Sequence, residues 1–237
     1  MPTQLALQLR EGTRQAHTLA ESADFIKCFL KGVVEKNSYR KLLANFYFVY
    51  SALEESLERH SQHPVLAPLH QPVLFRKQSL AQDLQYYYGP AWVREVSPSL
   101  ACQAYVSRIR QLSDTDPVLL IAHCYTRYMG DLSGGQILKG IAERGMNLSD
   151  GVGTAFYRFE GIPDEKQFKA NYRQMLDDLP LTEAQVAAIV IEANGSFQNN
   201  MKLFQELEGS LVKAIGQMLF NTLTRRNTRS APMAQSS

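Results

Sequence analysis

Residues 118–143 read VLLIAHCYTRYMGDLSGGQILKGIAE, and this stretch decides the fold. Its apolar residues recur at three- and four-residue spacing, which is the period of an amphipathic helix. Three of its glycines, Gly130, Gly134 and Gly135, fall within six residues, although a glycine inside a helix costs about 1 kcal/mol relative to alanine. Either the segment is a loop, or its backbone is approached so closely that side chains are excluded.

The register of the glycines favours the helix. If residues 118–143 form one α-helix, positions i, i+3 and i+4 share a face. One stripe then consists of Arg127, Gly130, Asp131, Gly134, Gly135 and Leu138, and the opposite side of Ile121, Tyr125, Tyr128 and Leu132. A face without side chains suits a flat, rigid ligand pressed against the backbone, or a very close helix crossing. Periodicity alone leaves both open.

The same helical period extends over most of the chain. It recurs in residues 41–60 and 181–219, and no sustained alternation of period two is present. The clearest internal loop is SDGVGT at residues 149–154. We therefore expect an all-α fold with one domain over residues 1–223, followed by a flexible polar tail at residues 224–237.

Two helix starts carry local signals. Asp116 precedes Pro117, which puts a capping side chain ahead of a proline at the first helical position. Thr182 is followed three residues later by Gln185, which is the spacing of a capping box.

Composition excludes several classes of protein. Hydrophobic residues make up 45% and charged residues 20% of the 237 residues, as in a globular protein. The net charge of +2 is too small to indicate nucleic-acid binding. No run approaches 18 apolar residues, so we expect no membrane span.

The cysteines indicate a reducing compartment. Cys28, Cys102 and Cys124 are widely spaced and form no zinc-ligand or covalent haem-attachment motif. Unpaired thiols are typical of cytosolic proteins, so we expect a cytoplasmic location. The N-terminal residues also lack the apolar stretch of a signal peptide.

A first candidate site lies near the N-terminus. Arg10, Arg14, His17 and Glu21 follow one another at spacings of 4, 3 and 4, so one helix would carry them on one stripe. Two guanidiniums beside an imidazole can clamp an anion next to a metal ligand. A carboxylate one turn after the imidazole can fix its tautomer. The alternative is a solvated charged face with an incidental histidine.

The histidines point to haem more than to a bare metal ion. None of the five follows a glutamate by three residues, so the Glu-x-x-His pattern of di-iron bundles is absent. His123 lies in an apolar stretch and is expected to be a hydrogen-bonded core residue. A single histidine ligand suits haem iron, because a bare metal ion requires three or four protein ligands.

Two further groups of cations are present. Lys169, Tyr172 and Arg173 share a face at i, i+3 and i+4, which forms an anion site if that face turns inward and a solvated face otherwise. A basic run could attract an acidic electron donor, although such runs are often solvated faces. It consists of Lys27, Lys31, Lys36, Arg40 and Lys41.

Around the His17 and glycine-rich segments, the sequence resembles the haem oxygenases that form biliverdin. The similar segments follow in family order from about residue 5 to residue 223. They are LREGTRQAHTLAE, AQDLQYYYG, HCYTRYMGDLSGGQILKGIA, FKANYRQM and NMKLFQELE. The form most resembled is the soluble one of cyanobacteria and plastids. The resemblance implies a helical bundle with haem between a proximal helix and a glycine-rich distal helix.

The resemblance also implies residue roles. His17 matches the axial ligand of the iron, and Glu21 the carboxylate beside it. Positions around the propionates are matched by Arg10, Arg14, Tyr125, Lys169 and Arg173. On the distal side the matches are Gly130, Gly134, Gly135, the proton-handling Asp131, and the polar Arg127, Tyr50 and Asn200, with Phe197 as a haem-wall aromatic. Arg10 and Arg14 stand where many relatives carry lysine, which adds bidentate carboxylate geometry.

The activity implied by the resemblance is oxidative cleavage of haem. Haem b, held without covalent bonds and without another metal, would be opened by O2 to biliverdin (the IX-alpha isomer), carbon monoxide and ferrous iron. The implied partners are ferredoxin or another acidic reductase as electron donor, and a bilin reductase downstream, as in phycobilin synthesis for photosynthesis.

Three alternatives remain at this point. A haem carrier or sensor on the same scaffold would bind haem without degrading it, but storage alone does not require Asp131 and the glycines. A thiaminase-like enzyme of similar helical fold would use Cys124 as a nucleophile, and it leaves His17 unexplained. A purely structural bundle leaves the three glycines unexplained.

Overall fold

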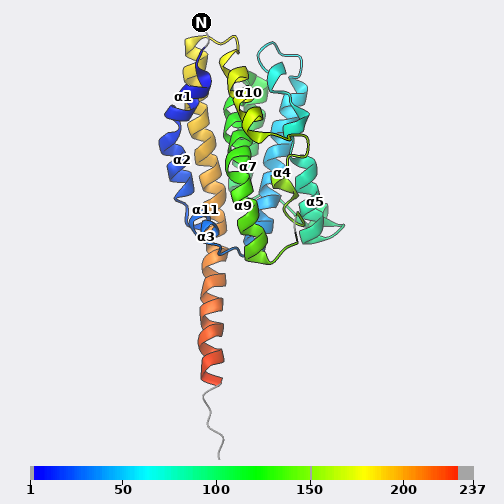
Figure 1. Cartoon of the computed structure of the whole chain (residues 1–237), viewed down its shortest axis with the longest axis vertical. Helices are drawn as coiled ribbons and strands as arrows, with labels where there is room; N and C mark the ends of the chain where they lie inside the picture. The colour runs from blue at the N-terminus through cyan, green and yellow to red at the C-terminus, as the bar shows by residue number, and fades with distance from the viewer. Residues whose placement is uncertain (1–2, 150, 229–237) are drawn as a thin grey trace, which may run out of the picture.

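The computed structural model describes residues 3–149 and 151–228, with side chains to residue 207, and its regular elements there are all helices. The expected all-α fold is confirmed (Figure 1). The α-helices are α1 (Leu5–Gly12), α2 (Arg14–Glu21), α3 (Asp24–Leu30), α4 (Lys36–Arg59), α5 (Lys77–Tyr88), α6 (Trp92–Glu95), α7 (Leu100–Thr115), α8 (Leu120–Cys124), α9 (Gly130–Met146), α10 (Glu165–Asp177) and α11 (Glu183–Thr228). Short 3₁₀ turns are η1 (Ala67–Leu69), η2 (Pro72–Leu74), η3 (Pro117–Leu119) and η5 (Ala155–Tyr157).

The long helices α4 and α11 organise the bundle. Helix α4 packs against α5, α7 and α11, whereas α11 also packs against α1, α2 and α3. In Figure 1, α1 and α2 lie beside α11 along one edge, and α9 runs lengthwise down the middle of the body. The core is rich in fully buried aromatic rings, each of which removes a large apolar area from water. They are Tyr39, Tyr50, Tyr105, Tyr128, Tyr172 and Phe156.

The N-terminal stripe is interrupted, contrary to the expectation of one continuous helix. α1 ends at Gly12, and Thr13 takes φ −108° and ψ 1° before α2 begins. The Thr13 hydroxyl donates to the Leu9 carbonyl at 2.7 Å, which competes with regular helix bonding. Gly12 also lies against α11, because a Cβ there would stand 2.5 Å from Cγ1 of Val190. The close contact between α1 and α11 therefore requires glycine at this position.

The glycine-rich segment is helical but not a uniform α-helix. After η3 and α8, the five residues of η4 (Tyr125–Met129) form a π-helix, and α9 then begins at Gly130. Pro117 occupies a first helical position as predicted, but the Asp116 side chain makes no capping hydrogen bond, so that part was wrong. A π-turn has i→i+5 bonding and is frequent at functional sites.

The C-terminal helix starts as predicted and continues past the expected domain limit. Thr182 Oγ1 accepts the Gln185 N–H at 3.2 Å, and Gln185 Oε1 accepts the Thr182 N–H at 2.9 Å, so the capping box is confirmed. Helix α11 projects beyond the body in Figure 1. It includes residues 224–228 of the expected tail, and residues 229–237 lie outside the described residues. Within the described chain, no helix combines the length and apolar character that crossing a membrane requires.

Candidate active site

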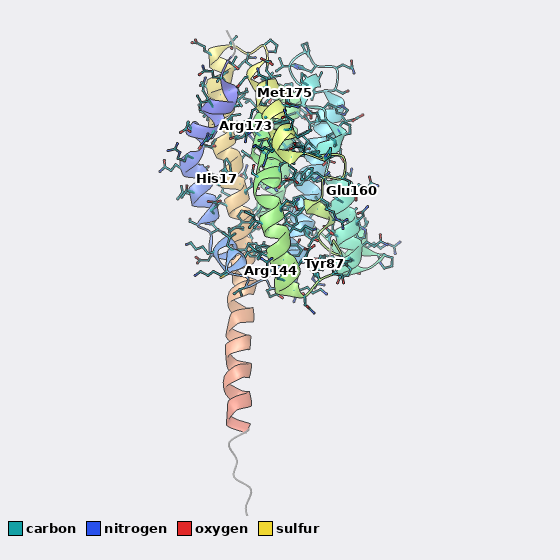
Figure 2. The ribbon with its side chains drawn as sticks, viewed as in Figure 1. His17, Tyr87, Arg144, Glu160, Arg173 and Met175 are labelled. Carbon is teal, nitrogen blue, oxygen red and sulfur yellow. The ribbon has the colours of Figure 1, made fainter. Side chains whose placement is uncertain are left out.

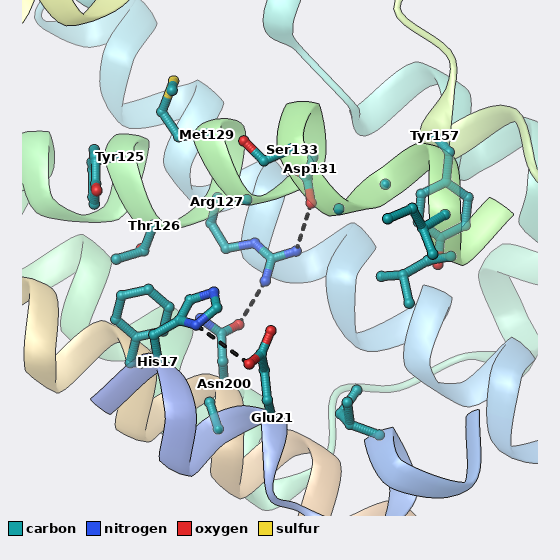
Figure 3. Close-up of a pocket in the computed structure, with 18 of the residues that line it drawn as sticks. His17, Glu21, Tyr125, Thr126, Arg127, Met129, Asp131, Ser133, Tyr157 and Asn200 are labelled. Atoms are coloured by element: carbon teal, nitrogen blue, oxygen red, sulfur yellow. Dashed lines mark hydrogen bonds and ion pairs between the residues drawn. The ribbon is translucent and has the colours of Figure 1, made fainter. Parts of the chain in front are cut away.

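A cavity of about 810 Å³ lies between the N-terminal helices and the glycine-rich helix. Helices α1, α2 and α3 form one wall, η4 and α9 the other, and α10 and α11 contribute at the ends. Figure 3 shows His17 and Glu21 across the cavity from Arg127 and Asp131. Its volume is in the range of sites for small molecules and cofactors.

Most of the predicted site residues line this one cavity. They are Arg10, His17, Glu21, Tyr125, Arg127, Gly130, Asp131, Gly134, Gly135, Arg173, Phe197 and Asn200. These residues come from α1, α2, η4, α9, α10 and α11, so the fold gathers segments that are far apart in sequence.

Three predicted site residues lie outside the cavity lining. The Arg14 side chain is 72% exposed and pairs with Glu11 on the other side of the break at Thr13. Lys169 donates to the Leu132 carbonyl at 3.0 Å and so contacts the far side of α9. Tyr50 lies behind the wall, fully buried, and its hydroxyl donates to Asp131.

His17 is oriented by two neighbours. Its Nδ1 lies 3.6 Å from Oε2 of Glu21, and its ring meets Phe197 edge-on with centroids 5.4 Å apart. With Nδ1 directed to the carboxylate, Nε2 is the ring nitrogen available to a metal in the cavity. Among the described residues, no three His, Cys, Asp or Glu side chains gather to share a metal ion.

The glycine face is open rather than a helix crossing. A Cβ at Gly130 or Gly134 would meet no heavy atom within 4 Å, whereas one at Gly135 would lie 3.3 Å from the Tyr157 ring. Bare backbone at Gly130 and Gly134 therefore faces the cavity, which is the arrangement a flat ligand requires.

The π-helix changes the register that the sequence predicted. A uniform α-helix would place Tyr125 on the side opposite the glycines, but Tyr125 lines the same cavity as Gly130. One π-turn separates these two residues, since each turn of η4 closes i→i+5. The register prediction for Tyr125 was wrong for this reason.

Behind the glycines, Asp131 belongs to a buried polar cluster. Its carboxylate accepts from the Tyr50 hydroxyl and lies 3.4 Å from Nη2 of Arg127. Arg127 also donates to Tyr50 at 2.9 Å and to Asn200 at 2.7 Å. Burial raises the pKa of Asp131 above its usual range, although Arg127 and the Tyr50 hydrogen bond act to lower it. An acid with a raised pKa is suited to proton transfer.

The opposite end of the cavity is basic. Arg10 and Arg173 both lie near the Tyr125 phenol: burial raises the pKa of Tyr125, and the two guanidiniums lower it. Guanidinium pairs bind carboxylates in a bidentate geometry. The site thus combines one histidine, a bare backbone face and a cationic end.

Several residues that line the cavity were not predicted from the sequence. Phe25 and Phe29, four residues apart on α3, give one apolar wall, and Phe156 and Tyr157 in η5 give another. Asp177 at the end of α10 also lines the cavity. The i, i+4 aromatic pair was readable as a helix face, whereas the place of η5 depends on tertiary packing.

The burial of His123 and of Cys124 tests what the sequence predicted for each residue. His123 is fully buried and its Nε2 lies 3.1 Å from Oε1 of Glu192, so it is a hydrogen-bonded core residue as predicted. Cys124 is also fully buried, and burial raises the pKa of its thiol. A nucleophilic cysteine requires exposure and a lowered pKa, so the thiaminase-like alternative has no nucleophile here.

The comparisons with known proteins agree with this geometry. The family model described as "Heme oxygenase" matches residues 3–206. "Heme oxygenase 1" of Nostoc sp. strain PCC 7120 is 63% identical over 98% of this chain and 97% of its own. "Heme oxygenase" of Rhodella violacea is 54% identical over 94% of this chain and 95% of its own. The crystal structure of heme oxygenase-1 from Synechocystis sp. PCC 6803 in complex with heme has a TM-score of 0.90 and 62% identity, over 92% of this chain and 99% of that one. The resemblance read from the sequence is confirmed: the chain belongs to the haem oxygenase family of haem-degrading enzymes.

Proposed function

We propose that this enzyme opens haem b, bound without a covalent link, to biliverdin IX-alpha, carbon monoxide and ferrous iron. The substrates would be haem and O2, and the electrons would come from ferredoxin or a similar acidic reductase. One observation carries the proposal: His17 faces the bare backbone of Gly130 and Gly134 across a single cavity with a cationic end. That combination fits an iron porphyrin with two carboxylates.

The proximal wall would hold the iron. His17 would bind it through Nε2, and the Glu21 carboxylate, 3.6 Å from Nδ1, would favour the neutral tautomer that carries its proton on Nδ1. The haem iron supplies O2 binding and electron transfer when haem is bound. Arg10 and Arg173 bind the propionates at the cationic end. Arg14 and Lys169 stay outside the lining, so we assign them a weaker, longer-range contribution to the positive field.

The distal wall would select the reaction. The bare backbone of Gly130 and Gly134 would lie against the substrate on the side opposite His17 and offers no side-chain base there, and Phe197 flanks His17 on the other wall. Asp131 would deliver protons through ordered water, with Tyr50 and Arg127 holding its carboxylate in place and Asn200 accepting a hydrogen bond from Arg127. A proton source that acts through water, rather than by direct contact, favours oxidation of the porphyrin over O–O cleavage at the iron.

A basic surface beside the cavity supports an acidic donor. A second cavity of about 360 Å³ is lined by Lys31 and Arg144, and Leu30 lines both cavities. The other cations of the run are partly engaged: Lys27 lies 3.5 Å from Asp24, and Lys36 and Arg40 stack on rings of α5. We therefore centre the donor surface on Lys31 and Arg144. A bilin reductase would consume the product, and the unpaired Cys28, Cys102 and Cys124 support a reducing compartment such as the cytoplasm.

The test is turnover of a one-to-one complex with haem. Under O2 and a reducing system, the Soret band should give way to the absorption of biliverdin, with carbon monoxide and ferrous iron released. A stable Soret band under these conditions would show a haem carrier or sensor instead. His17→Ala should abolish this turnover, whereas the matched control His63→Ala, which changes a histidine outside the cavity, should retain it.

A further inference from the structure

The N-terminal helix is tied to the end of α10 at one point beside the cationic end of the cavity. Oδ1 of Asp177 accepts the backbone N–H of Ala6 at 2.8 Å. The Asp177 carbonyl accepts the Thr3 N–H at 3.2 Å and the Thr3 hydroxyl at 3.3 Å. The Ala6 N–H lies in the first turn of α1, where backbone donors have no partner within the helix. Asp177 therefore both caps α1 and joins it to α10.

This contact stands one helical turn from each propionate-binding arginine. Arg10 follows Ala6 by four residues on α1, and Arg173 precedes Asp177 by four residues on α10. Four residues span about 6 Å along a helix. In Figure 1, α1 descends from the N-terminus toward α2, and Figure 2 shows Arg173 between Met175 and the level of His17. Both arginines line the cavity, as do Ala6 and Asp177.

We infer that Asp177 is a positioning residue that sets the spacing of the Arg10 and Arg173 guanidiniums, and through it the in-plane orientation of the bound macrocycle. The inference rests on the proposed function, because the two arginines are assigned there to the propionates. If α1 slides or tilts relative to α10, the two carboxylates are held at different points and another meso edge turns toward the distal wall. A rotated ligand would be opened at a different carbon, so the isomer ratio reports the contact.

The Asp177 carboxylate is the side-chain tie at this end of α1, beside the two Thr3 bonds to the Asp177 carbonyl and the buried Leu5 side chain. At its other end, α1 is held by Asn194 of α11, whose amide donates to the Gly12 carbonyl at 3.1 Å. Loss of the Asp177 side-chain acceptor would therefore leave the C-terminal end of α1 anchored and keep the Thr3 bonds, but it would remove the bond at Ala6 that fixes the first turn of α1, and with it Arg10, against α10. We expect a local change in α1 rather than a loss of the fold, since local opening can occur well below the global unfolding free energy.

The experiment compares Asp177→Ala, Asp177→Asn and the control Asp178→Ala. Asparagine keeps an oxygen for the Ala6 N–H and removes only the charge, whereas alanine removes the acceptor. Asp178 is exposed and its carboxylate accepts from Gln174, so its substitution leaves the Ala6 contact intact. In the ligand-free protein, hydrogen exchange of residues 4–9 should quicken about tenfold or more in Asp177→Ala, and stay near wild type in the other two.

The functional readout is the distribution of biliverdin isomers. Asp177→Ala should give a mixture, and Asp177→Asn should restore the wild-type distribution. With the dimethyl ester of haem, which lacks charged propionates, wild type and Asp177→Ala should give the same distribution. If the alanine variant does not fold, Asp177→Glu replaces it in the test. This variant retains the acceptor but moves it by one methylene, so it should also shift the isomer distribution.

Wild-type exchange in α1 together with a wild-type isomer ratio in Asp177→Ala would overturn the inference. Failure of Asp177→Asn to restore the ratio would overturn it too, since charge rather than the Ala6 contact would then be responsible. Failure of the proposed function has a different signature, because wild type itself would then form no biliverdin while the exchange experiment would still report on the Ala6 contact.

Discussion

Nδ1 of His17 lies 3.6 Å from the Glu21 carboxylate, one turn further along α2. Under the proposed function, this relationship would leave Nε2 for the haem iron, and Glu21 would tune the histidine ligand. Outer partners of metal-binding histidines typically change metal affinity by about 10–100-fold. Because both side chains are about half exposed, we expect Glu21→Gln to raise the haem dissociation rate by roughly tenfold, the lower end of that range. Transfer of haem to a scavenging apoprotein measures the rate. The control Glu55→Gln, on α4 and paired with Lys77, should match wild type.

Gly134 should tolerate a side chain in the empty protein but not in the complex. Its Cβ would meet no heavy atom within 4 Å, so Gly134→Ala should stabilise the ligand-free fold by about 1 kcal/mol. Gly134→Leu fills part of the cavity, and overpacking of about 1–3 kcal/mol predicts roughly 5–160-fold weaker haem binding. Urea unfolding and haem titration measure the two effects. Unchanged haem affinity and a single unchanged isomer in the leucine variant would contradict a close approach of the ligand at Gly134.

Asp131→Asn should separate binding from chemistry. The amide is isosteric and keeps an oxygen for Tyr50, but it cannot carry the proton that the carboxyl group handles. General acid–base groups contribute about 10²–10⁴-fold, so biliverdin formation should fall by about 100-fold or more while haem affinity stays within a few-fold. Stopped-flow absorption after reduction gives the rate. Normal biliverdin yield from this variant would remove Asp131 from the proton path.

The stability of the protein should depend on pH through Glu54. This residue is 5% exposed and accepts the backbone N–H groups of Arg76 and Lys77. Burial raises the pKa of Glu54 from 4.5 to about 7, against the effect of those hydrogen bonds. The folded state then binds this proton more tightly than the unfolded chain, so the free energy of unfolding falls as pH rises from about 4.5 to about 7.

Glu54→Gln removes this titration. Relative to the variant, wild type should lose up to about 1.4 kcal/mol of stability per pH unit within that window and show no further change above it. Urea unfolding of both proteins across the window measures the difference. Parallel pH profiles would show that Glu54 does not titrate there.

The donor surface predicts a charge effect that depends on the reductant. Lys31→Glu and Arg144→Glu reverse the charges lining the second cavity and should slow turnover driven by reduced ferredoxin several-fold at low salt. Turnover driven by a small neutral or chemical reductant should be unchanged, and the defect should shrink as salt rises. Arg110→Glu on α7 lines neither cavity and is the control. Equal slowing with both reductants would argue against a docking role.

The helices and their faces were predictable because they depend on local periodicity. Residues 41–60 and 181–219 were recognised from apolar spacing, and Thr182 with Gln185 from capping chemistry. The break at Thr13 was missed: it reflects a side-chain bond to Leu9 and the close packing of Gly12 on Val190, which is a tertiary contact. The π-helix at Tyr125–Met129 was missed because hydrophobic period assumes 3.6 residues per turn throughout.

The site was predicted best where residues share one helix. Gly130, Asp131 and Gly134 were placed together by spacing, and the structure puts them on one cavity. Tyr50 and Asn200 lie on other helices, α4 and α11, so only the family resemblance connected them to Asp131. Asp177 and Tyr157 carried no sequence signal, since their place at the cavity follows from the packing of α10 and η5.

The most direct test of the account is the absorption spectrum of the haem complex of His17→Ala, with and without added imidazole. Wild type should show imidazole-ligated haem that turns over to biliverdin. The variant should lose that spectrum and form no biliverdin, and free imidazole should restore the spectrum by filling the vacated ligand position. An unchanged imidazole-ligated spectrum in His17→Ala, before any imidazole is added, would contradict the assignment of His17 and with it the placement of haem in this cavity.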